Sequence, residues 1–106
     1  MTAEEIEARS RQSDELTEKI GKFVLTQKAR MDVASIAFMN LLGAAIMQTF
    51  GEQAATDFLR TMDDFIASHQ QDPEEKKFWN LMAEKGYDLP VAFGSKKKAK
   101  GMKANG

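Results

Sequence analysis

Few side chains in this sequence could carry chemistry. His69 is the only histidine that could act as a general base, and cysteine is absent. Nucleophilic catalysis needs an activated Ser or Cys together with a base. His69 is followed by two glutamines at the polar end of an expected helix, where a solvated histidine interacts favourably with the helix dipole. The sequence therefore predicts a protein that is not an enzyme.

Two adjacent carboxylates, Asp63 and Asp64, offer the oxygen ligands that a hard cation prefers. Neighbouring residues on a helix do not face one another, so we interpret this pair as part of a solvated acidic face with Glu52 and Asp57. Without cysteine there is no thiolate zinc site, and the Glu-x-x-His pairs of a di-iron bundle are absent. No glycine-rich phosphate loop follows a predicted strand. No cofactor or metal is therefore predicted.

Charge is unevenly distributed along the chain. The net charge is −6 over residues 1–94 and +5 over residues 95–106, where all the charged residues are lysines (Lys96, Lys97, Lys98, Lys100 and Lys103). This segment has almost nothing apolar to bury, so a disordered basic tail is predicted. It is either a solubilising terminus or a weak, non-specific arm for nucleic acid, because no aromatic residue is interleaved to stack on bases. Residues 9–30 are the other candidate for nucleic-acid contact.

Helical periodicity dominates the remaining sequence, and the predicted fold class is all-α, a small bundle of three to four helices. Thr2 and Glu5 have capping-box spacing, which marks a possible helix start at Thr2. Because the first turns are polar all round, residues 1–13 are predicted to form a polar, frayed or projecting extension, and residues 14–94 the helical domain. An apolar stripe begins at Leu16, Ile20, Phe23 and Val24. Residues 14–48 fit either one long helix or two helices. We favour a break near residues 29–32, where the stripe loses its register and Asp32 is a candidate N-cap.

Residues 33–50 are apolar on nearly every face of a helix. A membrane span needs about 20 predominantly apolar residues, and this run is shorter and has Asn40 near its middle. We interpret it as a buried helix of a cytoplasmic protein with no membrane contact. In so small a domain it must be covered by a bundle or by a second molecule. The predicted partner or homodimer interface comprises Ile36, Phe38, Met39, Asn40, Leu42 and Ile46.

Asn40 is open to two interpretations. It faces water through a gap in the bundle, or it meets the same residue of a second chain across a two-fold axis, where the two amides hydrogen-bond each other. We favour the second interpretation, because this helix has more apolar surface than one small monomer readily covers.

The remaining elements are marked by start and stop signals. Thr49 and Glu52 have capping-box spacing, which predicts a helix end near Gln48 and a new helix from Phe50. Asp72 followed by Pro73 begins a fourth helix, and Gly86 ends it. After Gly86 comes an extended segment with four large apolar residues, Tyr87, Leu89, Val91 and Phe93. It is too apolar to remain in water and is expected to cover the helices.

These patterns favour a non-enzymatic protein-binding module, a small helical regulator, adaptor or inhibitor that acts on a larger protein as a homodimer. The alternative is a nucleic-acid-associated protein that uses the basic tail as a non-specific arm. Specific DNA reading by the helical body is disfavoured, because the exposed face of the third helix is acidic and would be repelled by phosphate.

Overall fold

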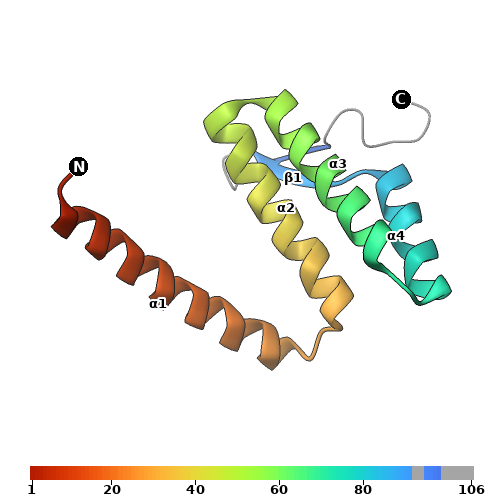
Figure 1. Cartoon of the computed structure of the whole chain (residues 1–106), viewed down its shortest axis with the longest axis horizontal. Helices are drawn as coiled ribbons and strands as arrows, with labels where there is room; N and C mark the ends of the chain where they lie inside the picture. The colour runs from red at the N-terminus through yellow and green to blue at the C-terminus, as the bar shows by residue number, and fades with distance from the viewer. Residues whose placement is uncertain (92–94, 99–106) are drawn as a thin grey trace. The chain divides into compact units, whose positions relative to one another are not determined.

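The computed structural model describes residues 1–91 and 95–98, the last four and Val91 at the level of the backbone. The fold is all-α with four helices, as predicted, followed by a short two-stranded sheet (Figure 1). The chain divides into two compact units, residues 1–35 and 36–106. The helix α2 begins in the first unit and continues into the second.

The first unit is dominated by α1 (Ala3–Gln27), which begins at the start that Thr2 and Glu5 marked in the sequence. Thr2 caps it, because its hydroxyl accepts a hydrogen bond of 3.1 Å from the Glu5 backbone N–H. The helix ends at Lys28, which has a left-handed backbone with φ 53°. Residues 3–13 are therefore helical and not frayed, and a break separates α1 from the next helix where the loss of register indicated one.

The helix α2 (Met31–Phe50) is continuous through two positions where the sequence suggested caps. Asp32 lies inside its first turn, where its negative charge interacts favourably with the helix dipole. It also forms an ion pair with Arg30. Thr49 also lies inside the helix, and its hydroxyl donates to the Ala45 carbonyl at 2.9 Å. The predicted Thr49–Glu52 capping box is therefore wrong. Gly51 makes the junction instead, because its φ of 95° suits glycine.

The helix α3 (Glu52–His69) and the helix α4 (Pro73–Lys85) pack against each other. The start of α4 is as predicted: the Asp72 carboxylate accepts a hydrogen bond of 2.9 Å from the Glu74 backbone N–H, and Pro73 occupies the first helical position. Gly86 ends the helix with a φ of 82°. Tight caps at both ends fix where the chain leaves α4 for the sheet.

The strands β1 (Asp88–Val91) and β2 (Ser95–Lys98) form an antiparallel pair, whose register places Leu89 opposite Lys97 and Asp88 opposite Lys98. The sequence patterns predict no strand, but an extended segment around residue 89 and a disordered tail from residue 95. The structure differs at residues 95–98, which pair with β1. Residues 99–106, the rest of that predicted tail, lie outside the described residues, as does Phe93.

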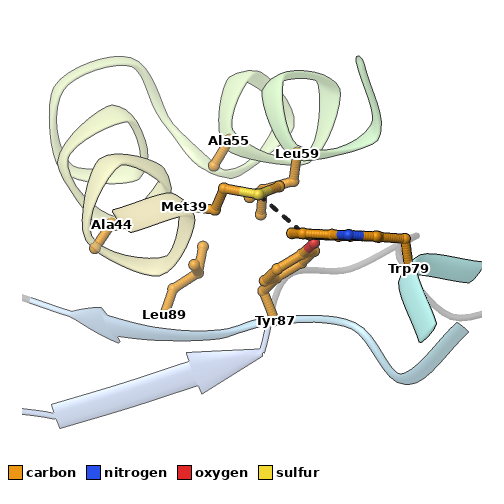
Figure 2. Close-up of a cluster of buried hydrophobic side chains, with 7 residues drawn as sticks. All are labelled: Met39, Ala44, Ala55, Leu59, Trp79, Tyr87 and Leu89. Atoms are coloured by element: carbon orange, nitrogen blue, oxygen red, sulfur yellow. Dashed lines mark hydrogen bonds between the residues drawn. The ribbon is translucent and has the colours of Figure 1, made fainter. Parts of the chain in front are cut away.

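The core of the second unit joins α2, α3, α4 and β1 around one cluster of buried side chains (Figure 2). Leu89 and Tyr87 reach the helices from the strand side, and both are almost completely buried, as the sequence predicted. Gly43 of α2 lets these elements come close: a Cβ there would lie 3.0 Å from a Leu89 methyl and 3.4 Å from a Leu59 methyl. The cluster comprises Met39, Ala44, Ala55, Leu59, Trp79, Tyr87 and Leu89.

Candidate functional site

The helix α2 has one face in the core and one face open. Phe38, Leu41 and Leu42 are 43%, 46% and 51% exposed, although all three are large and apolar. Their spacing of three and four residues places them on one side of the helix. Met39 and Gly43 lie on the other side, packed into the core. We call Phe38, Leu41 and Leu42 the α2 open face.

The predicted interface on α2 is divided between these two sides. Phe38 and Leu42 belong to the α2 open face. Met39 is a core residue at 5% exposure, and Ile36 and Ile46 pack partly buried against the same core. The sequence could not separate them, because a helix that is apolar all round shows no preferred face. Leu41, absent from the predicted set, completes the open face.

Asn40 does not lie on the α2 open face. It is two residues from Phe38, so the two side chains point about 200° apart around the helix. Its Oδ1 atom is buried and accepts no hydrogen bond within the described part of the chain. A dimer through the α2 open face would therefore not bring the two Asn40 side chains together, so an Asn40 pair across a dimer axis would need a different interface.

The predicted acidic face is also divided. Asp57 and Asp64 are exposed, and Asp57 accepts a hydrogen bond of 3.0 Å from the Gln53 side chain. Asp63 is 5% exposed and points into the core, where its Oδ1 accepts a hydrogen bond of 2.6 Å from the Tyr87 hydroxyl. Its interpretation as a solvated residue is therefore wrong. The carboxylate can occupy this core-facing position of α3 because the Tyr87 hydroxyl supplies a buried hydrogen-bond donor.

Burial raises the pKa of Asp63, an effect larger than the lowering by the Tyr87 hydrogen bond. Burial also raises the pKa of Tyr87, and the neighbouring carboxylate adds to that rise. Two further buried polar atoms, Asp63 Oδ2 and Trp79 Nε1, have no hydrogen-bond partner among the described residues. This polar cluster is closed to a ligand, since Asp63, Trp79 and Tyr87 are all at least nine-tenths buried.

His69 is the last residue of α3 and is exposed, in agreement with its predicted place at a helix end. Its ring stacks on Phe65 with 4.3 Å between the ring centroids, and Nδ1 lies 2.8 Å from the Phe65 carbonyl oxygen. Both contacts are local to the last turn of α3. Over the described residues, no group of three or more His, Asp or Glu side chains is arranged to hold a metal ion.

The helix α1 carries a second exposed apolar surface, and none of its 25 residues is buried. Leu16, Ile20 and Phe23 are 51%, 43% and 63% exposed. Ile6 is also exposed and falls within the same band of about 100° around the helix. We call Ile6, Leu16, Ile20 and Phe23 the α1 stripe. The sequence pattern predicted the part of this stripe at Leu16, Ile20 and Phe23, and no function was inferred from it.

Among the lysines of the predicted basic arm, Lys96, Lys97 and Lys98 lie in the strand β2, and Lys100 and Lys103 lie outside the described residues. Native sheets commonly carry lysine on edge strands to prevent pairing with other chains. This structural role accounts for lysine at residues 96–98 without a ligand.

By length and composition alone, one helix in the described part of the chain, α2, is long and apolar enough to cross a membrane. Helices of soluble proteins pass the same test, so this observation is weak evidence for a span. Comparison of the chain with protein-family models, with curated proteins and with solved structures found no match in any of the three.

Proposed function

We propose that the protein is a non-enzymatic, cytoplasmic binding module that docks a helix or strand of another protein on the α2 open face. The observation that carries this proposal is a large apolar face, Phe38, Leu41 and Leu42, on a helix with no charged residue from Val33 to Phe50. Depletion of charge at the centre of the contact surface is the compositional mark of protein–protein interfaces. Exposed apolar patches on small domains commonly mark such sites.

A protein partner fits this face better than a lipid bilayer does. The opposite side of α2 packs against Leu89 and Leu59 through Gly43, and Met39 and Ala44 are in the core. A helix that spans a bilayer would have to give up those contacts. A partner that covers only the open face leaves the core intact.

The test compares two lysine substitutions at sites with nearly equal exposure. Leu42 on α2 is 51% exposed and Leu81 on α4 is 53% exposed. The full-length tagged chain and the variants Leu42→Lys and Leu81→Lys are purified from the native host, and co-purifying proteins are quantified. We expect Leu42→Lys to recover at least tenfold less of a specific partner than wild type does. Leu81→Lys should retain that partner. Equal recovery by both variants contradicts the proposal.

Two further measurements test the other classes of partner. Flotation of the wild-type chain with phosphatidylcholine vesicles, abolished by Leu42→Lys, would assign the α2 open face to lipid and overturn the proposal. The nucleic-acid alternative is favoured by the +5 charge of residues 95–106. Fluorescence anisotropy with a labelled DNA duplex, measured against salt with and without residues 95–106, tests that arm separately.

A further inference from the structure

The helix α1 needs a covering surface of its own. Its stripe is exposed over a 25-residue helix that buries no residue. The stability of a protein helix comes mainly from packing its amphipathic face, and Gly21 in the interior lowers the intrinsic helix propensity further. The Lys22–Glu18 ion pair on its surface is fully solvated and contributes little. The stripe is therefore the part of α1 whose burial would stabilise it.

The spacing of the stripe is that of a helix–helix seam. Leu16 and Phe23 are seven residues apart, and Ile6 and Ile20 are fourteen apart, so all four fall in one heptad frame. The same frame contains Arg9 and Ser13, which makes the first half of the seam polar except at Ile6. A repeat of this kind pairs helices side by side with their seams in contact.

The seam residues can face one another in an antiparallel pair of identical helices. In the antiparallel register that overlaps residues 3–26 of two copies and brings their seams into contact, residues whose numbers add up to 29 face each other. Ile6 then packs on Phe23 of the second copy at both ends of the pair. Leu16 meets Ser13 in the middle, and Ile20 packs on the aliphatic stem of Arg9. A parallel pair in register would place each seam residue beside its own copy, so that Arg9 would lie against Arg9, a like-charge contact within the seam.

The charge pattern selects the same direction. Residues 3–8 contain Glu4, Glu5 and Glu7 and no base, whereas residues 19–30 contain four bases and no acid. An antiparallel pair places the acidic end of each helix beside the basic end of the other. A parallel pair places like charges together at both ends, which is unfavourable.

We propose that two copies of this chain associate through an antiparallel pairing of α1 along the α1 stripe. The contact uses residues of α1 alone, whereas the proposed function uses Phe38, Leu41 and Leu42 of α2, so the two proposals rest on different residues. The two-fold symmetry makes the interface self-complementary, and both Ile6–Phe23 contacts form together.

Sedimentation across a concentration series tests whether the pair forms. We expect the wild type to dimerise, and Ile20→Lys to weaken the dimer at least tenfold because it places a lysine against Arg9 of the second copy. The matched control is Leu25→Lys, which replaces a 73% exposed leucine about 140° around the helix from Ile20. It should leave dimerisation within twofold of wild type. A wild type that remains monomeric at all concentrations, as when another surface of its own chain or another protein covers α1, overturns the proposal.

Disulfide trapping tests the direction of the pair, and the absence of cysteine from the chain makes the background clean. Full-length Ile6→Cys and mass-tagged Phe23→Cys are mixed and oxidised with oxidised glutathione. The antiparallel pair predicts that the mixed disulfide exceeds both homodisulfides. Predominant Ile6→Cys and Phe23→Cys homodisulfides would indicate a parallel pair and overturn the proposal. The same two cysteine variants carrying Leu42→Lys should crosslink like those without it, so failure of the proposed function leaves this result unchanged.

Discussion

The Tyr87 hydroxyl donates a 2.6 Å hydrogen bond to Asp63 Oδ1 and so connects the segment that leads into β1 with the middle of α3. Both residues are almost completely buried. The hydroxyl also lies 3.9 Å from the Met39 sulfur, but its single proton goes to the carboxylate, the stronger acceptor. This bond makes a carboxylate acceptable inside a core that is otherwise apolar.

Removal of the hydroxyl should leave that carboxylate without a donor. We expect Tyr87→Phe to lower the free energy of unfolding at pH 7 by about 2–3 kcal/mol, the penalty for a buried group whose hydrogen bond is lost. Chemical denaturation measures this change. The double variant Tyr87→Phe with Asp63→Asn should lose less than the sum of the two single changes. Simple additivity would show that the bond contributes nothing of its own.

The raised pKa of Asp63 predicts a specific pH dependence of stability. Because the folded state holds this proton more tightly than the unfolded chain, the contribution of Asp63 is greatest below about pH 3.9, the ordinary value for Asp. That contribution is lost as pH rises through the raised folded pKa. We expect Asp63→Asn to gain stability relative to wild type as the pH increases over this range. A stability difference between Asp63→Asn and wild type that stays constant over this range would contradict the assignment.

Two glycines on different helices should respond oppositely to alanine. A Cβ on Gly21 meets nothing within 4 Å, so Gly21→Ala should stabilise α1 by about 0.5–1 kcal/mol through helix propensity. A Cβ on Gly43 lies 3.0 Å from a methyl of Leu89, which is completely buried. We expect Gly43→Ala to destabilise the protein by about 1–3 kcal/mol from overpacking. Thermal unfolding compares both with wild type, and a stabilised Gly43→Ala would show that Leu89 shifts easily.

The segment after α4 should divide into a part that the core requires and a part that it does not. A chain ending at Gly86 loses Tyr87 and Leu89, which are 1% and 0% exposed, and should lose about 3–6 kcal/mol of stability. A chain ending at residue 94 keeps both side chains and loses only the strand β2. We expect its thermal midpoint to fall by no more than about 4 °C, a shift of less than 1 kcal/mol in a domain of this size. Equal melting of the two truncations would mean that the sheet acts as one cooperative unit.

Local signals in the sequence determined the helices and several of their ends. Thr2 caps α1 and Asp72 caps α4 through contacts two or three residues away, and Gly86 ends α4 through its own backbone conformation. Such contacts depend only on neighbouring residues, so the sequence alone predicts them. The burial of Tyr87 and Leu89 was predictable for a related reason, because large apolar side chains without helical spacing still leave water.

The tertiary structure alone decided which side of α2 faces the core. A helix as uniformly apolar as α2 gives no indication that Met39 is buried and Leu42 open, and Gly43 decides this by admitting Leu89 and Leu59. The fate of Asp63 likewise depended on Tyr87, a donor 24 residues away. The β1–β2 pairing joins a lysine run of low strand propensity to a segment anchored by Leu89. In each case the deciding partner is distant in sequence, so that only packing in three dimensions brings the two groups together.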